Sequence, residues 1–89
     1  MIDDIFLNNL DYIDLHGYDM ESARVATEDF INDSFGLGRK KIVIIHGKGA
    51  GLVKKSVHGV LKRDKRVSCY KLSNNNDGMT IVYLLLDKH

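Results

Sequence analysis

The sequence contains no proline and no tryptophan, and it has a single cysteine among its 89 residues. One cysteine cannot form a disulfide within the chain, and no cysteine–histidine spacing typical of a zinc site is present. No apolar stretch approaches the roughly 18 residues that a membrane-spanning helix needs, and no basic-then-apolar leader of a secreted protein is seen. We therefore expect a cytoplasmic protein in a reducing compartment, with no membrane partner.

The chain is also short and nearly neutral. Its 13 basic and 12 acidic side chains give a formal net charge of +1, and 44% of its residues are hydrophobic. That hydrophobic content is too high for a disordered chain, and a domain of this length buries about 60–65% of the surface of its unfolded chain. We expect one small domain at 11–89, a short leader at 1–10, and a shallow surface site.

Opposite charges are segregated along the chain. Residues 1–35 carry nine acidic side chains and one basic side chain, Arg24, whereas residues 36–89 carry twelve basic and three acidic side chains. Two interpretations are open. The two halves attract each other in the fold, or the basic half forms a face that binds nucleic acid.

The spacing of apolar residues predicts the element order β-α-β-α-β-β. The expected strands are 12–16, 41–46, 67–72 and 79–86, and the expected helices are 20–35 and 52–64. Strands joined through helices pair in parallel, whereas the last two strands form a hairpin across Asp77-Gly78. The predicted fold is an α/β two-layer sandwich, with a four-stranded mixed sheet and both helices on one face.

A glycine-rich segment, His46-Gly47-Lys48-Gly49-Ala50-Gly51, separates the second predicted strand from the second predicted helix. Glycine lets the backbone approach a ligand closely, and the free N–H groups at the start of a helix bind anions. The segment lacks the spacing of a P-loop and of the dinucleotide fingerprint, so a plain turn and a phosphate site both remain open. In a phosphate site, the binding residues are Gly47, Lys48, Gly49, Gly51, Lys54 and Lys55.

Asp14 and His16 are two positions apart on the first predicted strand, which places them on one face about 6.5–7 Å apart. If the first two strands are parallel neighbours, His46 ends the second strand at the same edge of the sheet, and Lys48 follows it there. A carboxylate, two imidazoles and an ammonium group beside a phosphate can cleave a phosphodiester. Asp14, His16 and His46 could instead hold a divalent metal such as Mg²⁺, or be ordinary polar residues at strand ends.

Three other residues receive plainer interpretations. His58, on the second predicted helix, is expected at the surface. Cys69, within the third predicted strand, is expected to be a small core residue rather than a nucleophile. Tyr18 follows Gly17 at the proposed edge, where it either packs in the fold or stacks on a base.

Taken together, two motifs resemble those of the Smr (small MutS-related) domain. Ile13-Asp14-Leu15-His16-Gly17 is similar to its Leu-Asp-Leu-His-Gly motif, and His46-Gly47-Lys48-Gly49 is similar to its His-Gly-x-Gly motif. The resemblance covers residues 11–86. It implies the fold of the C-terminal domain of bacterial translation initiation factor three, binding to DNA or RNA, and, in many members, endonuclease activity, with a ribosome or a DNA-repair protein as a partner.

The resemblance also implies residue roles. Asp14 and His16 match positions associated with cleavage, and His46, Gly47 and Gly49 match the motif linked to nucleic-acid binding. The family's glycine-rich turn before the last strand is reduced here to Gly78. The leading hypothesis is a stand-alone Smr domain that nicks DNA or cleaves RNA. The alternatives are a non-catalytic binding or recruitment module and a protein-interaction domain, and the sequence leaves the metal dependence and the oligomeric state open.

Overall fold

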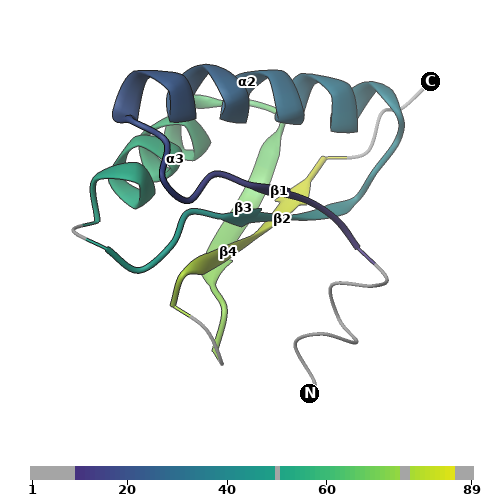
Figure 1. Cartoon of the computed structure of the whole chain (residues 1–89). Coiled ribbons are helices and arrows are strands. Elements are labelled where there is room, and N and C mark those ends of the chain that lie inside the picture. Colours follow the sequence, from purple (N-terminus) through teal and green to yellow (C-terminus); the bar gives the residue numbers. More distant parts are fainter. Residues whose placement is uncertain (1–9, 50, 75–76, 86–89) are drawn as a thin grey trace.

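The computed structural model describes residues 10–49, 51–74 and 77–85, which form one sheet and two helices (Figure 1). The elements are β1 (Asp11–Asp14), α2 (Met20–Gly36), β2 (Lys41–Ile45), α3 (Leu52–Arg63), β3 (Val67–Leu72) and β4 (Met79–Leu84). The predicted order is confirmed, and the bounds lie within two residues of those expected. The proposed leader, apart from Leu10, and the end of the expected last strand at residue 86 lie outside the described residues.

The four strands lie side by side in the order β1-β2-β4-β3. β1 and β2 are parallel, with Asp14 opposite Ile45, and β4 runs antiparallel to both β2 and β3. Because β1 and β2 are parallel, both end at the same edge of the sheet, at the left of Figure 1. β4 begins at this edge, since Met79 pairs with Ile45. Both helices also begin there, each after the strand that precedes it.

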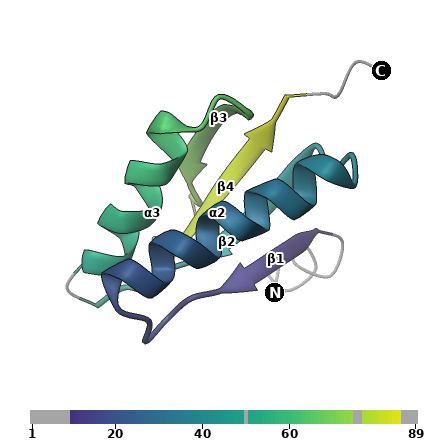
Figure 2. The same ribbon diagram turned by 90° about the horizontal axis from the view of Figure 1, so that it is seen from above.

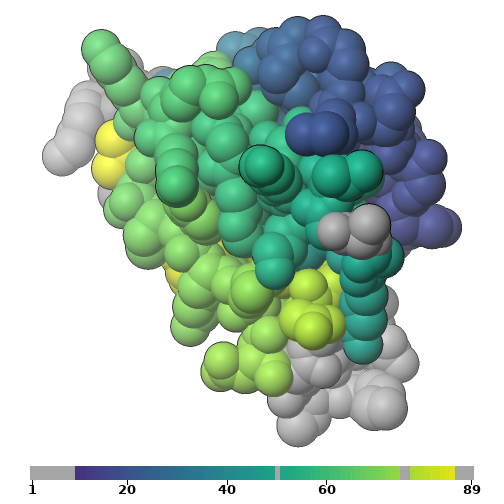
Figure 3. Space-filling view, turned by 90° about the vertical axis from the view of Figure 1, so that its left-hand side faces the viewer, coloured from purple at the N-terminus to yellow at the C-terminus, as the bar shows by residue number. Residues whose placement is uncertain are grey.

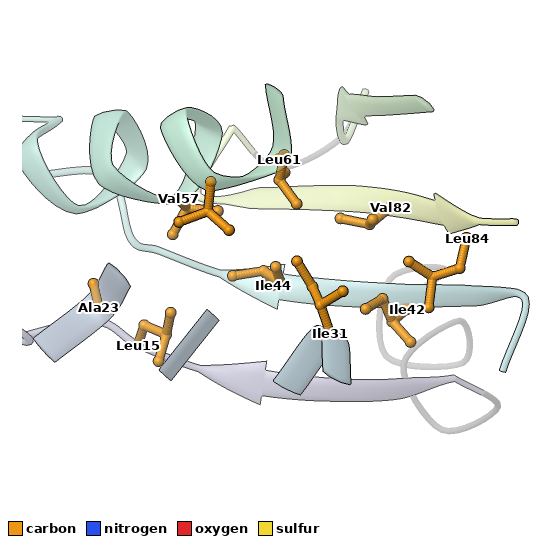
Figure 4. Close-up of a cluster of buried hydrophobic side chains, with 10 residues drawn as sticks. Leu15, Ala23, Ile31, Ile42, Ile44, Val57, Leu61, Val82 and Leu84 are labelled. Atoms are coloured by element: carbon orange, nitrogen blue, oxygen red, sulfur yellow. The ribbon is translucent and has the colours of Figure 1, made fainter. Parts of the chain in front are cut away.

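Both helices cover one face of the sheet, as the view from above shows (Figure 2). In α2 the buried residues recur every three or four positions, at Ala23, Thr27, Ile31 and Ser34, which places them on one side of the helix. The predicted two-layer sandwich is therefore confirmed. Its core lies between the layers (Figure 4) and contains Leu15, Ala23, Ile31, Ile42, Ile44, Val57, Val60, Leu61, Val82 and Leu84.

β3 contains an irregularity that overturns one expectation. Its register with β4 shifts between Val67 and Cys69. Val67 and Tyr70 both pack against the core, and Cys69 between them is exposed. An extra residue in a strand reverses the faces of the residues that follow it, so simple alternation fails here. The prediction that Cys69 is a core residue is wrong for this reason.

Charged side chains contribute little to the core but connect elements at the surface. Arg39, before β2, forms an ion pair with Asp11 of β1, with Nε 2.9 Å from Oδ2, and so joins the basic half of the chain to the acidic half. Arg66 donates to the side-chain oxygen of Asn32 on α2 at 2.9 Å. Within the described residues, neither helix is long and apolar enough to cross a membrane.

Candidate functional site

A cleft of about 650 Å³ opens at the edge of the sheet where β1 and β2 end. Figure 3 looks at this face, where purple residues after β1, teal residues between β2 and α3, and yellow-green residues at the start of β4 lie side by side. These three segments therefore meet here, and the meeting of the ends of β1 and β2 is what parallel pairing predicts. The cleft is lined by His16, Gly17, Tyr18, Ile45, His46, Gly47, Lys48, Gly49, Gly51, Leu52, Val53, Lys54 and Gly78.

Asp14 and His16 form a hydrogen-bonded pair beside this cleft. Nδ1 of His16 lies 2.6 Å from Oδ1 of Asp14, and the backbone N–H of His16 donates to the same oxygen at 3.1 Å. β1 ends at Asp14, so His16 lies in the following turn rather than on the strand, as predicted for it. The prediction that the two side chains lie together is confirmed.

The hydrogen bond to Asp14 determines which nitrogen of the His16 ring carries the proton. An ionised carboxylate only accepts hydrogen bonds, so Nδ1 of His16 carries a proton and, in the neutral ring, Nε2 keeps its lone pair. The hydrogen bond from the His16 ring is the main reason that the pKa of Asp14 lies below its ordinary value. Among the described residues, Nε2 of His16 has no hydrogen-bond partner. Asp14 thus orients an imidazole whose second nitrogen is available to a ligand.

Gly47 brings the loop after β2 against the residues after β1. Its φ is +83°, and a Cβ at this position would lie 3.3 Å from the Cβ of His16. The N–H groups of His46 and Gly47 both donate to the carbonyl of Gly78, at 2.9 and 3.0 Å. The turn before β4 is therefore bonded to the His46–Gly47 segment, which in turn touches His16.

His46 differs from His16 because it is 3% exposed and uses both ring nitrogens within the protein. Nδ1 lies 3.1 Å from the Gly47 carbonyl, and Nε2 lies 2.8 Å from the hydroxyl of Thr80. Since a carbonyl only accepts, Nδ1 donates and Nε2 accepts the proton of Thr80. Thr80 in turn accepts from Nε2 of His58, also at 2.8 Å. Each ring is held in one tautomer by this chain of hydrogen bonds.

His58 therefore occupies a different place from the one predicted. It is half-buried between α3 and the sheet, with its ring edge-on to His46 at 5.8 Å between centroids and tilted against Tyr70 at 5.1 Å. Burial lowers the pKa of both His46 and His58, and neighbouring positive charges lower the pKa of His58 further. The sequence carried one signal of this network, which is Thr80 standing among the apolar residues of β4, because a buried hydroxyl needs partners.

The basic residues of the predicted phosphate site do not all lie together. Lys48 and Lys54 line the cleft with Gly47, Gly49 and Gly51, whereas Lys55 is exposed and does not line it. Nζ of Lys48 lies 3.7 Å from Oδ1 of Asp77. Gly51 precedes α3 and, among the described residues, no side chain caps the first N–H groups of this helix. Glycine backbone, Lys48 and Lys54 thus contribute to the lining of one cleft.

A metal centre built on Asp14, His16 and His46 receives no support from this arrangement. In the described ranges, no three histidine, cysteine, aspartate or glutamate side chains come together as a metal-ligand set. Asp14 and His16 touch each other, whereas both nitrogens of His46 are bonded to Gly47 and Thr80. The three residues share an edge of the sheet without converging on one point.

Comparison with known proteins identifies the family. The model of the Smr domain matches residues 13–85 of the chain. The chain belongs to the Smr domain family. Its relatives include Endonuclease MutS2 of Clostridium tetani, 37% identical over 68 residues, and Endonuclease MutS2 of Finegoldia magna, 39% identical over 75 residues. These matches cover 76% and 81% of this chain but 9% and 10% of those proteins, so this Smr chain spans about a tenth of their length.

Solved structures agree with the family. The Smr domain of Thermus thermophilus MutS2 superposes with a TM-score of 0.82 at 26% identity, and the match covers 85% of this chain and 99% of that one. YdaL, a stand-alone small MutS-related protein from Escherichia coli, gives a TM-score of 0.78 at 24% identity over 82% of this chain and 63% of its own. The second likeness concerns the fold alone. The resemblance indicated by the two sequence motifs is therefore confirmed.

Proposed function

We propose that this Smr domain binds nucleic acid in the cleft at the sheet edge and cleaves a phosphodiester bond there. The observation that carries the proposal is the Asp14–His16 pair, with 2.6 Å between Oδ1 and Nδ1, beside a cleft that Lys48 and Lys54 line. The name Endonuclease MutS2 of the relatives supports it, although the matching segment is about a tenth of those proteins.

In this proposal His16 transfers the proton. Its Nε2 accepts a proton from the attacking hydroxyl, which belongs to water or, in RNA, to the 2′-carbon of the ribose, and can then return the proton to the leaving oxygen. Asp14 holds Nδ1 and stabilises the imidazolium that forms. Lys48, Lys54 and the N–H groups at the start of α3 stabilise the negative charge that develops on the phosphate.

His46 receives a positioning role rather than a proton-transfer role. Both of its nitrogens are bonded within the protein, and its side chain is buried. Its N–H and that of Gly47 hold the carbonyl of Gly78. His46 thus supports the loop that faces the phosphate, and the proton passes through His16 alone.

A cleavage assay tests the proposal. Single- and double-stranded DNA and RNA are incubated with the wild type, with and without Mg²⁺, and with His16→Ala, Asp14→Asn and the control Asp33→Asn, which alters an exposed acid on α2 away from the cleft. We expect His16→Ala to lower the cleavage rate by about 10²- to 10⁴-fold. Asp14→Asn should lower it by a smaller factor, because an amide oxygen still accepts from Nδ1 but carries no charge. Asp33→Asn should leave the rate unchanged.

Binding is measured on the same variants by fluorescence anisotropy. His16→Ala should bind within about twofold of the wild type, since affinity depends mainly on contacts to phosphates. Equal cleavage by the wild type and His16→Ala would remove the Asp14–His16 pair from the mechanism. Salt-dependent binding with no cleavage under any condition would make the domain a binding module. No binding at low salt would contradict the proposal altogether and favour an acidic protein as the partner.

A further inference from the structure

We infer that the cleft accepts an unpaired nucleotide whose base stacks on the ring of Tyr18. The domain would then bind single-stranded or otherwise unpaired segments in preference to a continuous duplex. This inference rests on the proposed nucleic-acid binding and adds to it the conformation of the substrate.

Tyr18 is placed at the cleft without being used by the core. Its residue is 43% exposed and lines the cleft, and in the described part of the chain its ring contacts no other aromatic ring. Its N–H donates to the carbonyl of Leu15 at 3.1 Å, which closes a tight turn that contains His16. A large apolar ring held in a fixed turn next to the proposed proton-transfer residue is available to a ligand.

The other apolar residues of the cleft lie at the start of α3. Leu52 is 56% exposed and lines the cleft, together with Val53. The starts of the two helices are joined, because the hydroxyl of Ser56 on α3 donates to the carbonyl of Met20 on α2 at 2.7 Å. Tyr18, just before α2, and Leu52, at the start of α3, therefore line the same cleft, and a hydrogen bond joins the two helices there.

The lining of the cleft matches the two parts of a nucleotide. Lys48 and Lys54 offer positive charge to a phosphate, whereas Tyr18 and Leu52 offer apolar surface to a flat base. A site for phosphate alone gains nothing from exposed apolar side chains. The volume of about 650 Å³ lies within the range of about 300–1,000 Å³ that is typical of sites for small ligands. The open cleft is thus large enough to hold a nucleotide rather than only to touch a backbone.

Stacking on Tyr18 requires a base with a free face. In a continuous duplex each base is covered on both faces by its neighbours, so an aromatic side chain reaches only base edges, sugars and phosphates. In a single strand, a loop or an end, a face is free, and stacking on an aromatic ring contributes about 1–3 kcal/mol per base whatever the sequence. The contribution of Tyr18 should therefore distinguish unpaired strands from duplexes.

Fluorescence anisotropy at low salt measures this difference. A labelled single strand and the same strand in a duplex are titrated with the wild type, Tyr18→Ala and Tyr18→Phe, and a gel checks that the strands stay intact. Tyr12→Ala is the matched control, because Tyr12 is 51% exposed on β1 and does not line the cleft. Circular dichroism confirms that each variant is folded.

We expect Tyr18→Ala to weaken single-strand binding by about 5- to 150-fold, which is the stacking contribution converted at about 1.4 kcal/mol per tenfold. Duplex binding by Tyr18→Ala should stay within about twofold of the wild type. Tyr18→Phe keeps the ring and should bind as the wild type does, as should Tyr12→Ala. A second readout uses 2-aminopurine in the single strand, whose fluorescence the wild type should quench by stacking and Tyr18→Ala should not.

Other outcomes overturn the inference in distinguishable ways. Equal losses on single strand and duplex, no loss on either, or equal wild-type affinity for the two would each show that the base does not stack on Tyr18, while nucleic-acid binding would stand. If the wild type binds neither oligonucleotide, both the inference and the proposed function fail.

Discussion

Gly47 lies so close to His16 that a Cβ placed on Gly47 would be 3.3 Å from the Cβ of His16. The two residues belong to different motifs, one after β2 and one after β1, and the parallel pairing of these strands brings them together. The φ of Gly47 is +83°, in the left-handed region. The glycine of the His-Gly motif is therefore needed for contact between two loops as well as for its own turn, and Lys48, the next residue, lines the same cleft as His16.

Substitution of Gly47 should cost more stability than substitution of the other glycines that line the cleft. Gly47→Ala imposes a left-handed conformation on alanine and also crowds His16, so we expect the free energy of unfolding to fall by about 1–3 kcal/mol. Gly17 has a similar φ of +84° but open space around it, and Gly17→Ala should show the smaller cost of the conformation alone. Gly49 has neither constraint, and Gly49→Ala should change stability little. Urea denaturation measures all three.

The test is the order of the three variants by the loss in their free energy of unfolding. If Gly47→Ala and Gly17→Ala were equally destabilised, the loop would have moved away from His16 without cost, and the close approach would have no energetic consequence. If Gly49→Ala were as destabilised as Gly47→Ala, the left-handed conformation itself would be irrelevant.

The hydroxyl of Thr80 is shared by two histidines, which makes it costly to remove. Thr80→Val keeps the shape of the side chain but leaves Nε2 of both His46 and His58 without its partner in a buried place. An unsatisfied buried polar group costs about 1–3 kcal/mol, so we expect Thr80→Val to lower the free energy of unfolding by at least that amount in urea denaturation.

Thr27→Val provides the matched control for Thr80→Val. Thr27 is equally buried, but its hydroxyl only donates to the carbonyl of Ala23, one turn earlier in the same helix, at 2.7 Å. Its removal leaves no buried donor unpaired and should cost less. Equal destabilisation of the two variants would mean that the histidine network adds nothing to stability.

The fold could be predicted from the sequence because its signals are local. The spacing of Ala23, Thr27 and Ile31 indicates a helix with one buried side, and the apolar run Ile42–Ile45 indicates a central strand. The edge of the sheet at which Asp14 and His46 lie then follows from the rule that parallel strands end together. The location of the site was therefore predictable from element order alone.

The arrangement of side chains within that location was not predictable, because it depends on contacts between distant segments. His58 lies on α3 and meets Thr80 of β4, 22 residues away along the chain. The exposure of Cys69 depends on the register shift between β3 and β4, and no residue pattern in β3 indicates that shift. Whether Lys54 or Lys55 lines the cleft depends on how α3 is rotated over the sheet, and adjacent lysines give no signal of that rotation.

The two histidines bonded to Thr80, one buried and one half-buried, should make stability depend on pH. Burial holds the pKa of His46 and of His58 below the ordinary value of about 6.5. Below that pH the unfolded chain binds more protons than the folded chain, so stability is complete above about pH 6.5 and falls as the pH falls. We expect the free energy of unfolding to decrease as the pH falls below about 6.5. In His58→Gln the decrease should be shallower, because glutamine can donate to Thr80 without titrating.

The titration of Asp14 does not contribute to the change in stability over this pH range. The pKa of Asp14 is lowered from a value already near 4, so its contribution is lost only at pH values near and below that one. Identical pH slopes for the wild type and His58→Gln would show that His58 is not a source of the pH dependence.

Asp77 should limit the affinity of the cleft for nucleic acid. Its carboxylate lies 3.7 Å from Nζ of Lys48, and a phosphate approaching Lys48 must displace it. Exposed ion pairs of this kind are weak, so we expect Asp77→Asn to tighten oligonucleotide binding by about two- to fivefold at low salt. The gain should shrink as salt screens the charges. Asp33→Asn makes the same change in net charge on α2, away from the cleft, and should tighten binding less. Equal gains from the two variants would mean that net charge, rather than competition for Lys48, sets the affinity.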